Sequence, residues 1–258
     1  MRMLRISLIP ADSAVHSIVI PAYKEAANLS RTIEGITNAL EAAGFSDFEI
    51  IVIDDASNDG TAELMANMEA RDPRIRGIMN TTRTGFGRSI RQGLDLYSGD
   101  SVCITMADQS DDPADLVRYL ALLDEGAECV FGSRFSNASR LHGYPFRKYL
   151  ANRLVNSCIQ LMFLLPLNDI TGAFKCYRRH VIDGIQPLVS NSFNITVEMP
   201  LKAISRGYRY EVIPINWTNQ ADRTSNLRLG RMAPYYLFSI LVVWLERLLI
   251  PRDNTRKN

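Results

Sequence analysis

The chain has 258 residues, 47% of them hydrophobic, which is enough for one large α/β domain or two small ones and excludes a disordered protein. Lysine and arginine total 29 against 28 aspartates and glutamates, so the net charge of +1 gives no electrostatic reason to expect a nucleic-acid partner. The four cysteines are far apart and lack CxxC spacing. We therefore expect buried thiols in a reducing compartment, without zinc or disulfide use.

Both ends of the chain are predicted to lie outside the main domain, which we place at residues 17–230. Residues 1–16 have too short an apolar segment for a secretory signal and are expected to form a loose leader. Residues 231–258 are predicted to form an apolar and basic C-terminal helix. Its uncharged run of 14 residues, 232–245, falls short of the roughly 20 that cross a membrane, so it should lie at a membrane interface or close a core.

Charge near the C-terminus favours a membrane surface. Residues 222–258 contain seven lysines and arginines against three aspartates and glutamates. This local excess would attract an anionic lipid surface, although a solvated tail explains it as well. We expect a protein that stays on the cytoplasmic side, peripheral on the cytoplasmic face of a membrane.

The first predicted strand, residues 17–20, leads into a candidate base pocket. Pro21 ends the strand, and Tyr23 and Glu25 follow it. The tyrosine ring offers a face for stacking, and the glutamate can accept hydrogen bonds from a base or a ribose. A helix with apolar residues at helical spacing then runs from 28 to 43.

The second buried strand, residues 48–53, closes at two acids. Asp54 is explained equally well as an acceptor for turn amides, and Asp55 is the better candidate for a ribose hydroxyl. A third strand at 75–79 precedes Gly85 and Gly87. Because the third glycine of a dinucleotide fingerprint is replaced by Ile90, we expect these glycines to serve helix packing against the sheet.

The stretch from residue 100 to 113 is the predicted working centre. A short apolar strand at 101–106 delivers Asp108 to its carboxyl end, where ligands bind in open α/β sheets. Carboxylates there suit Mg²⁺ or Mn²⁺ carried in by a phosphate. Asp111 and Asp112 precede Pro113, so capping of the following helix also explains them, whereas Asp108 lies too early to cap.

The next strand, residues 128–131, ends at Arg134. A guanidinium facing the acidic edge suits a diphosphate, and a surface salt bridge is the alternative. The alternation of strands and helices, with polar strand ends on one side, predicts a doubly wound, mostly parallel α/β sheet with flanking helices. The second half is basic around apolar runs, including a helix at 147–165 that begins at Arg147.

Five ordered motifs give the chain a family resemblance over about residues 17–230. They are IVIPAYKE at 18–25, IDDASNDGT at 53–61, MAD at 106–108, GSR at 132–134 and DITGAFK at 169–175. Together they resemble family 2 glycosyltransferases, and most closely the dolichyl- or polyprenyl-phosphate mannosyltransferase branch. The resemblance implies a GT-A fold, a GDP- or UDP-linked sugar donor, a divalent metal and inversion at the anomeric carbon.

Carried over by position, the resemblance also names site residues. Asp108 would be the metal carboxylate, and the donor contacts would be Pro21, Tyr23, Glu25, Ile53, Asp55, Ala107, Asp108 and Arg134. The chain departs from the family where Met106 replaces the first acid of Asp-X-Asp and Ser110 replaces a glutamine. It departs again where Gln220 and Asn226 stand for an arginine and a lysine. We hypothesise that Asp111 or Asp112 supplements the metal site, and that Arg223 or Arg228 supplies charge to the diphosphate.

Three functions follow as hypotheses. The first is transfer of a hexose to a polyprenyl-type phosphate, with Asp108, Arg134 and Arg147 as the catalytic residues; a phosphate oxyanion needs no general base. The second is transfer to a sugar hydroxyl, with Glu198 or Asp169 as the base. The third is a protein that binds a nucleotide sugar or a partner without transfer. The donor base, the sugar and the oligomeric state stay open.

Overall fold

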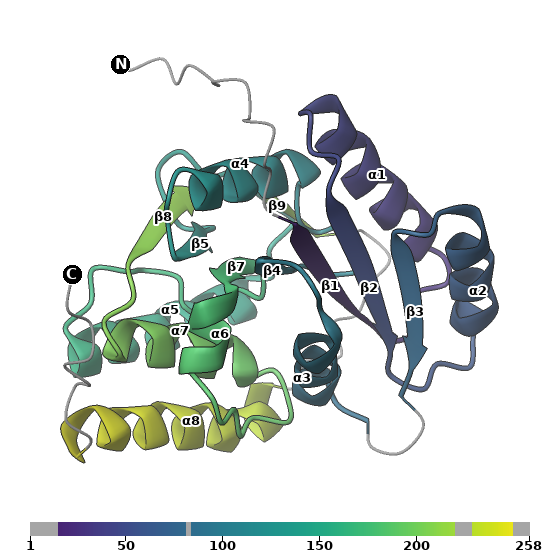
Figure 1. The fold of residues 1–258 in the computed structure, drawn as a ribbon. Helices are drawn as coiled ribbons and strands as arrows, with labels where there is room; N and C mark the ends of the chain where they lie inside the picture. The colour runs from purple at the N-terminus through teal and green to yellow at the C-terminus, as the bar shows by residue number, and fades with distance from the viewer. Residues whose placement is uncertain (1–14, 81–83, 220–228, 250–258) are drawn as a thin grey trace.

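The computed structural model describes residues 15–80, 84–219 and 229–249, and a central sheet runs through it (Figure 1). The sheet has seven strands in the order β3-β2-β1-β4-β7-β5-β8. All neighbours pair in parallel except β7, which is antiparallel to both β4 and β5. The strands are β1 (His16–Ala22), β2 (Phe48–Asp54), β3 (Ile75–Met79), β4 (Ser101–Ile104), β5 (Cys129–Ser133), β7 (Lys175–Arg178) and β8 (Tyr210–Pro214).

Helices cover both faces of this sheet. One face carries α1 (Leu29–Ala42), α2 (Thr61–Arg71) and α4 (Pro113–Asp124). The other carries α3 (Phe86–Leu96), α5 (Phe146–Phe163), α6 (Arg179–Gly184), α7 (Ile195–Ser205) and α8 (Leu229–Leu249). The predicted doubly wound, mostly parallel α/β fold is therefore confirmed.

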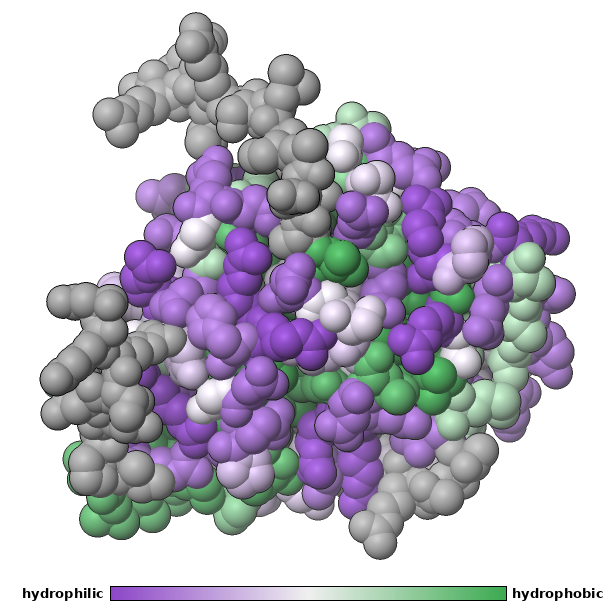
Figure 2. Space-filling view, in the orientation of Figure 1, coloured by the Kyte–Doolittle hydropathy of each residue, from purple (hydrophilic) through white to green (hydrophobic). Residues whose placement is uncertain are grey.

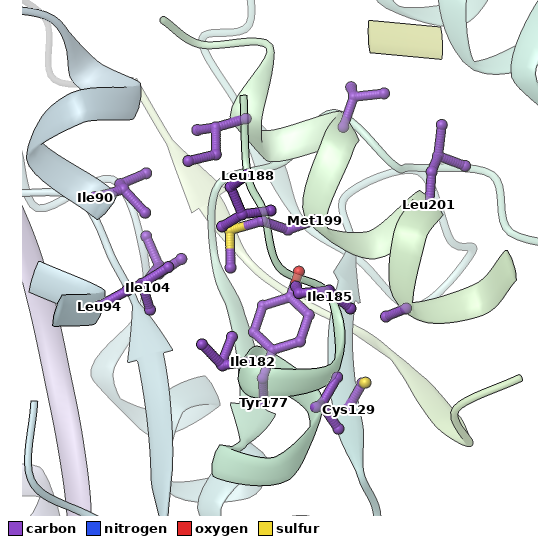
Figure 3. Packing of buried hydrophobic residues seen from close by; sticks show 14 of the residues in the cluster. Ile90, Leu94, Ile104, Cys129, Tyr177, Ile182, Ile185, Leu188, Met199 and Leu201 are labelled. Carbon is purple, nitrogen blue, oxygen red and sulfur yellow. The ribbon is translucent and has the colours of Figure 1, made fainter. Parts of the chain in front are cut away.

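Two apolar layers follow from this arrangement, one on each face of the sheet. All seven residues of β1 and of β2 are buried, because a parallel strand covered on both sides has no solvent face. Figure 3 shows the layer beneath α3, α6 and α7, where Tyr177 of β7 lies among aliphatic side chains. The first strand begins at His16, which is buried, one residue before the predicted start of the strand.

A second, two-stranded sheet lies beside the carboxyl ends of the main strands. It pairs β6 (Leu141–His142) with β9 (Trp217–Thr218), and Trp217 also forms an isolated bridge with Asp111. The segments that follow β5 and β8 are thereby held next to the loop that contains Asp108.

Helix α8 is longer than the 14-residue uncharged run on which the prediction was based. Its Met232–Leu249 segment has a mean hydropathy of 1.4, is 17% buried, and is long and apolar enough to cross a membrane by length and composition alone. The expectation that this stretch is too short was wrong, because the helix continues past Glu246 and Arg247. Those two side chains are directed to the protein: Glu246 pairs with Lys202 at 3.5 Å, and Arg247 donates to the Phe163 carbonyl at 2.6 Å.

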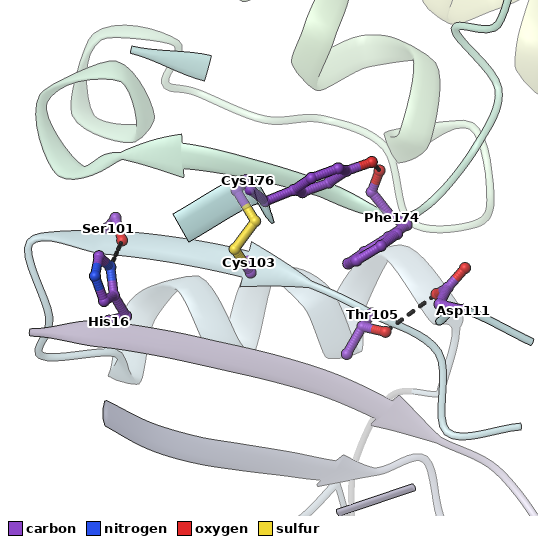
Figure 4. The surroundings of a disulfide bond; sticks show 8 residues. His16, Ser101, Cys103, Thr105, Asp111, Phe174 and Cys176 are labelled. Carbon is purple, nitrogen blue, oxygen red and sulfur yellow. Dashed lines mark hydrogen bonds between the residues drawn. A yellow bond between two sulfur atoms is a disulfide. The ribbon is translucent and has the colours of Figure 1, made fainter. Parts of the chain in front are cut away.

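The cysteine prediction also needs correction. Cys103 of β4 and Cys176 of β7 are direct partners in the antiparallel register and form a disulfide (Figure 4). Cys158 is exposed on α5, and Cys129 is buried; neither belongs to a disulfide. Sequence spacing could not reveal the pair because the two residues are 73 positions apart and meet through a returning strand that was not predicted.

Candidate functional site

The loop between β4 and α4 is held by its own carboxylates. Asp108 accepts a hydrogen bond from the Ser110 amide at 3.1 Å. Asp111 accepts from the Thr105 hydroxyl at 3.1 Å (Figure 4) and from the Met106 amide at 3.1 Å. Burial, and then the nearby charge of Asp108, raise the pKa of Asp111 to about 6. The loop therefore brings two acids together on the side of the sheet where the strands end.

Asp112 has a different role. Its side chain accepts from the Ala114 amide at 3.0 Å and caps α4, with Pro113 in the first turn. It also accepts from the Asn216 side chain at 3.3 Å. Asp112 is thus the capping residue that the sequence offered as an alternative, and Asp111 is the acid that lies within the electrostatic reach of Asp108.

The described residues offer few ligands for a divalent metal ion. Within the described part of the chain, no group of three or more histidines, cysteines, aspartates and glutamates could hold a metal ion. A hard cation wants about six oxygens. Asp108 is the carboxylate that would hold Mg²⁺ or Mn²⁺ here, and the remaining ligands would have to come from a bound diphosphate and water.

Arg134 lies at the end of β5 and forms a buried ion pair with Asp169. Its Nε and Nη2 donate to the two carboxylate oxygens at 2.8 Å each, and its backbone amide donates at 2.9 Å. Burial raises the pKa of Asp169, but the charge and hydrogen bonds of Arg134 outweigh it and hold that pKa below its usual range. The guanidinium also donates to Thr171 at 3.2 Å, so one edge of Arg134 is fixed by the protein.

Lys148, rather than Arg147, is an α5 cation within electrostatic reach of Asp108 and Arg134. Burial lowers the pKa of Lys148, with smaller and opposing effects from Asp108 and Arg134, so both charges lie within its reach. Arg147 is exposed one position earlier. Lys148 shares a helix face with Asn152, four residues later, which donates to Thr171 at 2.6 Å. That spacing was the signal in the sequence that could have identified Lys148.

The predicted donor contacts lie at the ends of β1 and β2. Pro21 and Ile53 are partners in the parallel register, and Tyr23 beyond them is 45% exposed and able to stack. Glu25 is buried and accepts from the Asn28 side chain at 3.2 Å. Ala107 is buried across the loop, where its carbonyl accepts from a hydroxyl of α1.

The two acids after β2 have different hydrogen-bond partners. Asp54 accepts from the amide and hydroxyl of Ser57, which is the turn role. Asp55 instead accepts from the Gly85 amide at 2.8 and 2.9 Å and from Ser89 at 3.2 Å. Asp55 therefore ties the end of β2 to the start of α3, and its described hydrogen bonds do not join the group around Asp108 and Arg134.

The two glycines at the start of α3 do not serve packing against the sheet. A Cβ on Gly85 would lie 2.6 Å from the Asn191 carbonyl, and one on Gly87 would lie 2.7 Å from the Ser190 carbonyl. They allow α3 to approach the segment before α7. The prediction was wrong because the partner of this helix end lies about a hundred residues later in the chain.

The remaining candidates fall into two groups. Glu198 is fully buried in α7, accepts from the amides of Val189 and Ser190, and pairs with Lys202 at 3.2 Å. It stabilises a helix rather than facing the strand ends. Four predicted loop positions lie outside the described residues: Gln220, Arg223, Asn226 and Arg228.

Comparison with known proteins agrees with this geometry. The model of glycosyl transferase family 2 matches residues 17–185. A polyprenol monophosphomannose synthase of Mycolicibacterium smegmatis is 29% identical over 79% of this chain and 77% of its own length. Glycosyltransferase AglD of Haloferax volcanii is 27% identical over 93% of this chain, which spans only 38% of that protein.

Solved structures show the same fold. The glucosyl-3-phosphoglycerate synthase of Mycobacterium tuberculosis, solved with Mn²⁺, UDP and glucosyl-3-phosphoglycerate, superposes with a TM-score of 0.68 at 20% identity, over 93% of this chain and 82% of its own. This likeness shows the GT-A architecture alone. The family match over residues 17–185 places the chain in glycosyltransferase family 2, and the protein is a glycosyltransferase.

Proposed function

We propose that the protein transfers a hexose, with inversion, from a GDP- or UDP-linked sugar to a polyprenyl-type lipid phosphate at the cytoplasmic face of a membrane. The similarity to a polyprenol monophosphomannose synthase supports this acceptor class. The observation that carries the proposal is the proximity of two cations, Lys148 and Arg134, together with the engagement of both predicted bases, Glu198 and Asp169, by other groups of the protein.

The acceptor follows from that pairing. A sugar hydroxyl must lose a proton to a general base, whereas a phosphate oxyanion is already nucleophilic at neutral pH. Glu198 is enclosed in α7, and Asp169 is held by Arg134 with a lowered pKa. Both carboxylates are already engaged by other groups of the protein, which supports an anionic acceptor held by Lys148 and the fixed guanidinium of Arg134.

Two exposed apolar helix faces support a lipid acceptor. On α5, the exposed side chains recur every fourth residue, opposite to Lys148; they are Phe146, Leu150 and Leu154, with Leu161 further along. Helix α8 packs on α5 and α7 and turns its other face outward, with Tyr235, Phe238, Leu241, Leu245 and Leu248. In Figure 2 the edge of the molecule formed by α8, at the lower left, is largely hydrophobic. A membrane would cover both faces and leave the cationic cluster close to lipid headgroups.

The mechanism then needs positioning and charge. Tyr23 stacks on the base, and Glu25, just after the end of β1, accepts hydrogen bonds from the nucleoside. Asp108 would hold a divalent cation, which when bound supplies charge stabilisation to the departing diphosphate. Lys148 and Arg134 orient the acceptor oxyanion for in-line attack on the anomeric carbon, and the nucleoside diphosphate leaves from the opposite side.

The test compares neighbouring cations of α5. Purified protein is incubated with UDP- and GDP-hexoses and with undecaprenyl or dolichyl phosphate, and the lipid-linked product is detected. Lys148→Met should lower kcat about a hundredfold, as loss of one charge-stabilising donor does. Arg147→Met, the exposed neighbour, should lower it less than threefold.

Two outcomes would count against the proposal. Equal rates for the two variants would remove Lys148 from the site. Transfer to a sugar hydroxyl but to no lipid phosphate would favour the second hypothesis, and no release of sugar from any donor would favour a binding protein.

A further inference from the structure

Lys175 is a buried cation with no direct part in the proposed transfer. It is 2% exposed and lies on β7, where its register partners are Ile104 of β4 and Phe131 of β5. Those two strands lead to Asp108 and to Arg134. Lys175 therefore lies between the two arms of the candidate site.

Its ammonium group binds the loop that holds Arg134. Nζ donates to the Ile170 carbonyl at 2.9 Å and also to the Gly172 carbonyl. These two carbonyls flank Thr171, which accepts hydrogen bonds from both Arg134 and Asn152. The same loop begins with Asp169, the partner of the Arg134 guanidinium. Lys175 thus holds this loop through its backbone carbonyls, and the side chains of the same loop hold the Arg134 guanidinium.

This arrangement costs stability. Within the described residues, no carboxylate lies within 4.0 Å of Lys175, so the ammonium is buried without a direct counter-ion. Burial lowers the pKa of Lys175 to about 7, and the charge of Arg134 lowers it further. The charges of Asp169 and Asp111 act in the opposite direction and raise it. An apolar side chain of similar length would avoid this desolvation cost, while giving up the hydrogen bonds to the Ile170 and Gly172 carbonyls.

A second buried lysine provides the contrast. Lys202 of α7 is 1% exposed, but it pairs with Glu198 at 3.2 Å and with Glu246 at 3.5 Å. Its charge is compensated and joins α7 to α8. Lys202 has the partners of a structural lysine, and Lys175 lacks them.

We propose that Lys175 is a positioning residue, which holds the Asp169–Gly172 loop so that the Arg134 guanidinium faces the acceptor phosphate; this inference rests on the proposed function. The cation contributes to orientation at the site while reducing the stability of the fold. A purely structural lysine would stabilise the fold and would have no effect on orientation at the site.

The experiment compares Lys175→Met with Lys202→Met in the full chain. For Lys175→Met we expect an unchanged or higher thermal midpoint, an unchanged donor KM, and a kcat lowered about tenfold to a hundredfold, as for loss of a positioning group. Lys175→Arg should restore most of that kcat. Lys202→Met should lower the thermal midpoint with kcat per folded molecule unchanged. Loss of stability in Lys175→Met with full kcat per folded molecule would overturn the inference.

Hydrogen exchange separates this inference from the proposed function. Without any substrate, the peptide covering residues 168–174 should exchange faster in Lys175→Met than in wild type, and equal exchange would overturn the inference. A wild type inactive on lipid phosphate, with faster exchange in the variant, would count against the acceptor alone. If Lys175→Met does not fold, pH profiles decide: kcat of the wild type should fall above pH 7 and that of Lys175→Arg should not, and identical profiles would contradict the role of the charge.

Discussion

The two halves of the site use their charged side chains differently. At the ends of β1, β2 and β4, most acids accept from groups a few residues away in the chain, as Asp54 does from Ser57 and Asp111 from Met106, whereas Asp55 reaches Gly85. Beyond β5, the charges pair over long range, as in Arg134 with Asp169 and Lys202 with Glu246. The first half is preformed by short loops, and the second depends on correct packing of distant segments. We therefore expect mutations in the second half to affect stability and function together, with Lys175 as the exception.

The largest effect is expected for Asp169→Ala. It leaves the Arg134 guanidinium buried without its partner, which should cost about 3–5 kcal/mol in the free energy of unfolding. Chemical denaturation measures this loss. The matched change in the first half, Asp54→Ala, removes only local turn hydrogen bonds, and a cost as large as that of Asp169→Ala would contradict the comparison.

The next effect is a pH dependence of stability. The pKa of Lys175 is about 7 in the folded protein, below its value of about 10.5 in the unfolded chain. Between these values the unfolded chain binds more protons, so stability should rise with pH, by at most about 1.4 kcal/mol per unit. Denaturation at pH 7.5 and 9 should show this rise in wild type and a smaller rise in Lys175→Met. The same rise in both proteins would show that another group causes it.

A charge on the outer face of α8 tests the membrane surface. The double variant Phe238→Glu, Leu241→Glu should bind anionic vesicles about tenfold more weakly, because each acid replaces exposed apolar surface and is repelled by the lipid headgroups. Sedimentation with vesicles measures the binding. Glu63→Ala on α2, far from this face, is the control, and equal binding by all three proteins would remove α8 from the membrane contact.

The smallest effect should separate the two adjacent acids after β4. Asp112→Ala removes a helix cap and should cost about 1 kcal/mol in stability, with Mn²⁺ affinity unchanged. Asp111→Ala is the comparison and should weaken Mn²⁺ affinity, since Asp111 lies near Asp108. Titration of Mn²⁺ in the presence of a nucleoside diphosphate measures the affinity. A weaker affinity in Asp112→Ala would show that the cap is also a ligand.

The sequence by itself determined the sheet class and the edge where the site lies. Apolar runs such as 50–53 are typical of strands covered on both faces, and Asp108 and Arg134 each follow a predicted buried strand, so both were predicted to reach the same edge. The placement of Asp112 as a cap was also readable, because capping depends on residues within one turn.

Only the tertiary structure decided the pairing of distant residues. The antiparallel strand β7 brings Cys176 to Cys103 and Lys175 between β4 and β5, and no local pattern records that return. The choice of Lys148 over Arg147 depended on which face of α5 packs inward. Periodicity reports which residues share a helix or strand face, but the partner of each face is fixed by packing between segments far apart in the chain.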